Sequence, residues 1–156
     1  MQDTDLLQQL IDDIGTARKL LELTDAEYQA LAERDLAGLE NLLTQKQTLL
    51  ALLGQHGSSR SRALTSAGLT ADRAGLQAYA AKSTVGTALL EHAEQLDATL
   101  EACRTANERN GKLIRTNQRA VGDMLQILQS SSQTPGLYDR RGAASKGAYQ
   151  RPLSRA

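Results

Sequence analysis

Few side chains in this sequence of 156 residues could carry out catalysis or bind a metal ion. His56 and His92 have no carboxylate or cysteine at ligand spacing, and no Glu-x-x-His pair occurs. Cys103 is the only cysteine, which excludes an intrachain disulfide, and its place between Leu100 and Asn107 favours a small buried hydrophobe. The sequence therefore predicts no catalytic site, no metal site and no cofactor.

One short segment invites comparison with a nucleotide-binding loop. Residues 110–113 read Asn-Gly-Lys-Leu, which is similar to the end of a phosphate-binding loop. The upstream position that such a loop needs as glycine is Ala106, and Leu113 stands where the metal-binding hydroxyl would be. The match fails on both residues, and no glycine-rich dinucleotide motif occurs elsewhere.

Three asparagines, Asn107, Asn110 and Asn117, are the polar residues with the most informative spacing. They interrupt a seam of residues that alternate in steps of four and three, the pattern of a long helix packed along another helix. The seam consists of Leu89, Ala93, Leu96, Leu100, Cys103, Asn107, Asn110, Ile114, Asn117, Val121, Met124 and Leu128.

The asparagines allow two interpretations, which the pattern alone leaves open. They could be internal residues that set the helix register by pairing with polar groups on neighbouring helices. Alternatively, this half of the helix is an uncovered groove of amide and apolar side chains for a helix of another chain, because three unpaired amides in a dry core would be costly. The groove would include Ile114, Val121, Met124, Leu125 and Leu128.

The composition predicts an all-α protein. Leu and Ala, which favour helices, dominate the apolar residues, whereas Phe and Trp are absent and Tyr supplies all the aromatic residues. A compact core usually draws on larger aromatic side chains. We therefore expect an elongated, antiparallel three-helix bundle with coiled-coil-like packing, a short connector helix and a flexible C-terminal tail.

The apolar periodicity and the capping residues predict helices at about 4–33, 36–66, 71–82 and 84–131. Asp35 and Thr70 are expected to cap the second and third of these, and Gly68 to end the second. Lys46 falls within the leucine stripe of the second helix, where we expect its stem to cover apolar surface and its amine to reach solvent. The predicted bundle covers residues 1–132, and residues 133–156 form a flexible basic tail.

Charge and hydropathy restrict the cellular context. The formal net charge is zero, and the basic half of the long helix lacks interleaved aromatic residues, so no nucleic-acid partner is expected. The N-terminus is acidic where a signal peptide needs positive charge. The longest purely apolar run, from Leu49 to Leu53, is too short for insertion into a membrane. A cytoplasmic location is therefore expected.

The asparagine-containing segment carries a family resemblance. The run from Asn107, Asn-Glu-Arg-Asn-Gly-Lys-Leu-Ile-Arg-Thr-Asn, continues through Val121 and Leu125 and is followed by Tyr138-Asp-Arg-Arg-Gly142. This pattern resembles the FlgN family of cytoplasmic flagellar export chaperones. The predicted helical hairpin, short connector, long helix and loose tail resemble the architecture of that family across most of the chain.

The resemblance implies specific partners. It implies binding to the C-terminal helical segments of the hook-associated proteins FlgK and FlgL, and delivery of these clients to the type III export gate, including FlhA. Client binding would map to Asn107, Asn110, Ile114, Asn117, Val121, Met124, Leu125 and Leu128, and to the apolar pair Leu137 and Tyr138 in the tail. Tyr138 would correspond to a family tyrosine implicated in docking to the export machinery.

Two other classes of function compete with an export chaperone. A structural coiled-coil protein would use the same seam for self-association, and a weak homodimer is compatible with either function. An enzyme or cofactor-binding bundle would need a bound metal or nucleotide, for which the sequence has no ligand pattern.

Overall fold

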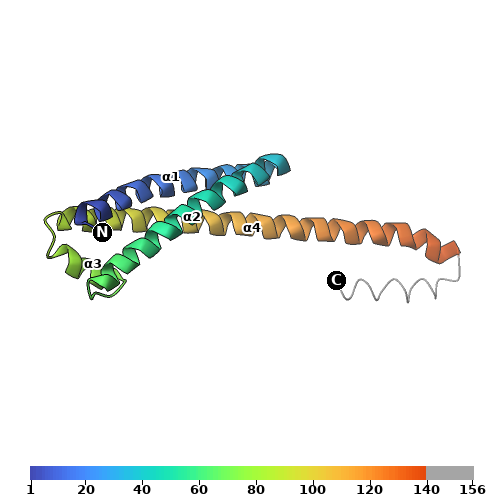
Figure 1. Ribbon diagram of the computed structural model, residues 1–156. Coiled ribbons are helices and arrows are strands. Elements are labelled where there is room, and N and C mark those ends of the chain that lie inside the picture. Colours follow the sequence, from blue (N-terminus) through green and yellow to red (C-terminus); the bar gives the residue numbers. More distant parts are fainter. Residues whose placement is uncertain (140–156) are drawn as a thin grey trace. The chain divides into compact units, whose positions relative to one another are not determined.

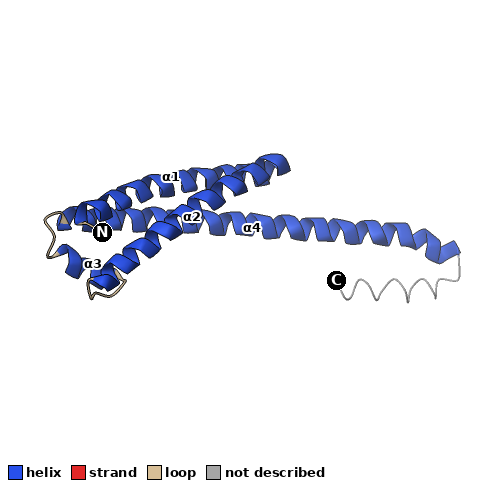
Figure 2. Ribbon diagram, in the orientation of Figure 1, coloured by secondary structure: helices blue, strands red, loops and turns tan. Residues whose placement is uncertain are grey.

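Four helices form all the regular structure of the computed structural model, which describes the backbone of residues 1–139 and the side chains of residues 1–131. The helices are α1 (Asp3–Glu33), α2 (Leu36–Ser66), α3 (Arg73–Ala80) and α4 (Gly86–Asp139). Figure 2 shows short loops between them, and no strand occurs in residues 1–139. The predicted all-α bundle with a short connector helix is confirmed.

The helix ends are set by caps, some of which differ from those predicted. Arg34 adopts a left-handed conformation (φ 58°) that ends α1 without a glycine, and Asp35 accepts a hydrogen bond from the Gly38 amide at 3.0 Å. Asp72, rather than Thr70, caps α3 by accepting from the Gly75 amide at 2.8 Å. Helix α4 continues to Asp139 instead of ending at residue 131, and residues 140–156 of the predicted tail lie outside the described part of the chain.

Contacts divide the chain into two units, Met1–Leu113 and Ile114–Ala156. Within the first unit, α1 and α4 run parallel, because Cys103 contacts Ala17 and Asn110 contacts Thr24 at nearly the same sequence separation. Helix α2 runs antiparallel to α1, as expected after the short turn at residues 34–35 (Figure 1). The first unit is therefore a bundle of α1, α2 and the first part of α4, with α3 at one end.

The hydrophobic core lies mainly between α1 and α4. Its buried members come from one face of each helix, with Leu76 and Tyr79 of α3 packed against them. Helix α2 contributes less, since Leu43 and Leu50 remain about half exposed. The broad stripe on α2 is therefore covered on only part of its width. The buried members of the core are Leu6, Leu10, Ile14, Ala17, Leu89 and Leu96.

None of the helices in the described part of the chain is long and apolar enough to cross a bilayer.

Candidate functional site: one face of helix α4

A group of polar side chains, three of them buried, lies where α1, α2 and α4 meet. We call Glu27, Lys46, Asn107 and Asn110 the polar junction. The Lys46 amine donates to Glu27 Oε2 at 3.0 Å and to Asn107 Oδ1 at 3.2 Å, and the Lys46 residue is only 7% exposed. The expectation that Lys46 reaches solvent is wrong, because its charge is met inside the bundle by the Glu27 carboxylate.

Asn110 is a buried member of the junction with every polar atom engaged. It is 1% exposed, and its amide nitrogen donates to the Thr24 carbonyl at 2.8 Å and to Glu27 Oε1 at 2.9 Å. Its amide oxygen accepts from Arg109 at 3.1 Å. A fully satisfied amide of this kind fixes the register of α4 on α1. Of the two interpretations left open by the sequence, Asn110 fits the internal one.

Asn107 and Cys103 complete the internal face of α4. Asn107 is largely exposed, but its amide oxygen is held by Lys46. Cys103 is buried and donates from its thiol to the Ala17 carbonyl at 3.3 Å, and burial raises the pKa of the Cys103 thiol. The prediction that Cys103 is a small packing residue is confirmed.

The outer edge of the junction is closed by Arg109. Its guanidinium lies 4.3 Å from the centre of the Tyr28 ring and pairs with Asp25 at 3.0 Å. The Arg109 side chain is partly exposed, so these contacts orient α4 on α1 but contribute little to the free energy of unfolding.

Beyond Leu113 the same face of α4 changes character. We call Ile114, Val121, Met124, Leu125 and Leu128 the α4 stripe. Each of these side chains is between 39% and 60% exposed, and Asn117 on the same face is half-buried. At 100° per residue these six side chains project within about 100° of one another, so they share one face of α4. Residues 114–128 therefore carry one exposed and mainly apolar face.

The structure brings together some of the predicted site residues and separates others. Ile114, Asn117, Val121, Met124, Leu125 and Leu128 share one face, whereas Asn107 and Asn110 belong to the polar junction. The border between the internal seam and the exposed face thus lies after Leu113, not at Asn107. The side chains of Leu137 and Tyr138 lie outside those that the structure describes.

Sequence reasoning missed two features of α4 and its partners. Ile127 is 65% exposed and lies about 110° from the middle of the α4 stripe, so it is apolar without belonging to that face. The ion pair of Glu27 and Lys46 was also missed. The sequence did indicate this pair. Glu27 stands in the apolar stripe of α1 and Lys46 in that of α2, and a short turn joins the two helices.

Comparisons with known proteins agree with this architecture. The family model described as FlgN protein matches residues 1–146. A crystal structure from Pseudomonas aeruginosa, described as that of a flagella synthesis protein FlgN, is 41% identical, with a TM-score of 0.69. The match covers 82% of this chain and 98% of that chain. None of the curated proteins compared with the chain matches it.

Proposed function

Because this chain belongs to the FlgN family, which comprises flagellar chaperones and not enzymes, we propose that it binds the C-terminal helical segments of FlgK and FlgL. In this proposal it keeps these clients unassembled in the cytoplasm and delivers them to the export gate. The observation that supports the proposal best is the α4 stripe, an exposed apolar face on a helix long enough to align with a client helix.

The physical basis of client binding is the burial of matching apolar stripes. Each half-exposed side chain of the α4 stripe would contribute on the order of 1 kcal/mol when a client helix covers it. Asn117 would offer an amide for polar positions of the client without requiring one tight register. An interface of this modest size suits a client that has to be released after delivery.

The polar junction has a different role in this proposal. Asn107 and Asn110 hold the part of α4 that lies in the first unit in register on α1 and α2. We keep Leu137 and Tyr138 as proposed contacts, with the Tyr138 region facing FlhA, on the family resemblance alone.

A matched pair of variants tests the site. Met124→Asp with Leu128→Asp places two charges on the α4 stripe, while Ile127→Asp places one on the same helix outside the stripe. Calorimetry with the C-terminal helical segment of FlgK should show at least about a hundredfold loss of affinity for the double variant. The Ile127→Asp control should stay within about threefold. Full affinity in the double variant would exclude the stripe as the client site.

Self-association is the second candidate, since the same exposed heptad spacing suits a second copy of the chain. Sedimentation of the full chain distinguishes the two. A tight homodimer that Met124→Asp with Leu128→Asp dissolves would assign the stripe to self-association, whereas a monomer with an intact client site supports the chaperone.

A further inference from the structure

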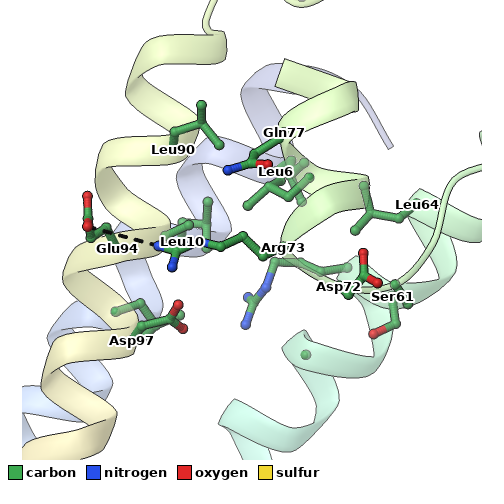
Figure 3. A pocket seen from close by; sticks show the side chains of 16 residues that line it. Leu6, Leu10, Ser61, Leu64, Asp72, Arg73, Gln77, Leu90, Glu94 and Asp97 are labelled. Carbon is green, nitrogen blue, oxygen red and sulfur yellow. Dashed lines mark ion pairs between the residues drawn. The ribbon is translucent and has the colours of Figure 1, made fainter. Parts of the chain in front are cut away.

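A second candidate docking surface lies at the opposite end of the first unit from the polar junction. A pocket of about 600 Å³ opens between the last turns of α2, α3 and the first turns of α4 (Figure 3). We call it the α3 pocket. Leu6 and Leu10 of α1 and Leu96 of α4 are buried in its floor, and Leu90 on its wall is 37% exposed. The interior of the pocket is therefore largely apolar.

The walls of the α3 pocket follow two helices for about two turns each. On α2 they comprise Gly57, Ser61 and Leu64, and on α4 they comprise Leu90, Glu94 and Asp97. Both sets repeat at steps of three and four, so each wall is one helix face about 11 Å long. Two helical walls of this length fit two turns of a third helix better than a small rigid molecule.

Helix α3 is fixed in place, which keeps the pocket open. The Gly75 backbone packs so closely on Thr70 that an added Cβ would lie 1.7 Å from the Thr70 carbonyl oxygen. An added Cβ on Gly86 would likewise lie only 2.0 Å from the Ala80 carbonyl oxygen. The Tyr79 hydroxyl donates to Asp3 Oδ1 at 2.6 Å and ties α3 to the start of α1. A preformed pocket of this kind costs a partner little ordering entropy.

The mouth of the α3 pocket is acidic. Asp72, Glu94 and Asp97 line it, against Arg73 and Arg60. Arg60 forms an ion pair with the buried carboxylate of Asp13, which compensates the Arg60 charge. Asp13 also contacts His56 Nδ1 at 2.6 Å. Arg73 reaches across the mouth to Glu94 at 4.0 Å with both side chains mostly exposed, so this pair is easily replaced (Figure 3). The uncompensated charge at the mouth is negative.

We propose that the α3 pocket docks an amphipathic helix of a partner protein whose apolar stripe is flanked by lysine or arginine. Leucine-like side chains of that helix enter between Leu64 and Leu90, and its basic flank faces Glu94 and Asp97. The site lies wholly within Met1–Leu113 and does not depend on client binding by the α4 stripe.

Two glycines of α2 supply a blocking variant and its control. Gly57→Leu places a side chain in the pocket, and the atom nearest to an added Cβ is the Arg60 guanidinium nitrogen at 4.0 Å, an ordinary van der Waals contact. Gly54→Leu makes the same change three residues earlier, outside the pocket, with no atom within 4 Å of the added Cβ. Both changes raise helix propensity, so both variants should fold.

The probes are two synthetic helical peptides of about 20 residues, a length at which isolated helices begin to form. They share one leucine stripe and carry either lysine or glutamate on its flanks. Fluorescence anisotropy is measured with the full chain and its variants in a background of Met124→Asp with Leu128→Asp. This background removes binding to the α4 stripe, so a failure of the proposed client site and a failure of the α3 pocket are distinguishable.

The lysine peptide should bind at least about fivefold more tightly than the glutamate peptide, with a preference that fades at high salt. Gly57→Leu should weaken it about tenfold while Gly54→Leu leaves it unchanged, and Glu94→Lys with Asp97→Lys should reverse the charge preference. Equal binding to the two glycine variants, equal binding of both peptides, or no binding would overturn the proposal. So would a homodimer that Gly57→Leu dissolves, since the occupant would then be a second copy.

Discussion

At the scale of single residues, the buried ion pair of Lys46 and Glu27 makes the bundle sensitive to loss of either partner. Both side chains are less than a tenth exposed, so neither charge can be solvated if the other is removed. Lys46→Met should lower the free energy of unfolding by about 3–5 kcal/mol because it leaves a buried carboxylate without its cation. Urea unfolding measures this loss directly.

Two further variants separate charge pairing from packing at this position. Lys46→Met combined with Glu27→Leu should recover much of the loss, since buried pairs can be replaced by apolar residues at little cost. Lys19→Met removes a partner of the exposed pair with Glu22 and should change stability by less than about 0.5 kcal/mol. A single Lys46→Met variant as stable as Lys19→Met would contradict the structure.

Heptad spacing explains which of these residues could be found from the sequence and which could not. It correctly assigned Leu89, Leu96 and Cys103 to an internal face, because apolar side chains at seam positions are buried whatever lies opposite. Heptad spacing could not decide whether the side chains of Lys46 and Asn110 are buried or exposed. The fate of a polar side chain depends on its partner on another helix, and spacing within one helix does not name that partner.

At the scale of elements, the close approach of α3 to the preceding loop requires a glycine. Gly75→Ala would bring a methyl group against the Thr70 carbonyl, which should destabilise the protein by about 2 kcal/mol or more. Gly15→Ala is the matched control, because it lies inside α1 with no atom within 4 Å of an added Cβ. It should stabilise by about 0.5–1 kcal/mol. Opposite shifts in thermal unfolding temperature are expected, and shifts in the same direction would contradict this packing.

The hydrogen bond between Tyr79 and Asp3 anchors α3 in a pH-dependent way. Hydrogen bonds from Ser83 and Tyr79 lower the pKa of Asp3, and the bond to Asp3 raises the pKa of Tyr79. The contribution of ionised Asp3 to the free energy of unfolding is present above about pH 4 and is lost as the pH falls through the folded-state pKa of Asp3. That of Tyr79 is present below about pH 10 and is lost as the pH rises through its folded-state pKa.

Tyr79→Phe should therefore lower the denaturant midpoint between pH 4 and pH 10, and the difference in midpoint from the unmodified protein should shrink below pH 4 and above pH 10. Denaturant unfolding at pH 3, 7 and 11 would measure this window. Tyr28→Phe, which keeps the ring beneath Arg109, is the control and should have little effect. A loss at pH 7 that persists unchanged at pH 3 would show that the hydroxyl acts through packing and not through Asp3.

The elements themselves were largely predictable, whereas their ends were less so. The bounds of α1 and α2 follow from long apolar periodicity and from the Asp35 cap. The start of α3 was predicted too early because Thr70 and Asp72 both have capping side chains, and only the backbone geometry selects Asp72. The left-handed Arg34 had no sequence signal, since a non-glycine residue takes that conformation only where tertiary packing holds it.

At the scale of the whole molecule, the two units divide stability from proposed binding. Every residue of the hydrophobic core and of the polar junction lies in Met1–Leu113, whereas the α4 stripe begins at Ile114. The family resemblance mapped client binding from Asn107 onward, whereas the structure places the division after Leu113. Asn110 is instead among the most deeply buried side chains.

Truncation at two points tests this division. A chain ending at residue 113 should keep the cooperative unfolding transition and the unfolding free energy of the full chain within about 1 kcal/mol, because all of the buried core remains. A chain ending at residue 106 also loses Asn107 and Asn110. The Glu27 carboxylate then loses the hydrogen bond that Asn110 donates to it, so this shorter chain should be less stable by about 2–3 kcal/mol.

Client binding separates the two roles of α4, because the two truncations should have the same effect on client binding and different effects on the free energy of unfolding. Both chains lack the α4 stripe, so neither should bind the C-terminal segment of FlgK, while only the shorter one should lose stability. Equal stability of the two chains would return the border to Asn107. Client binding by the chain ending at residue 113 would move the client site into the first unit, where the α3 pocket is the exposed apolar surface.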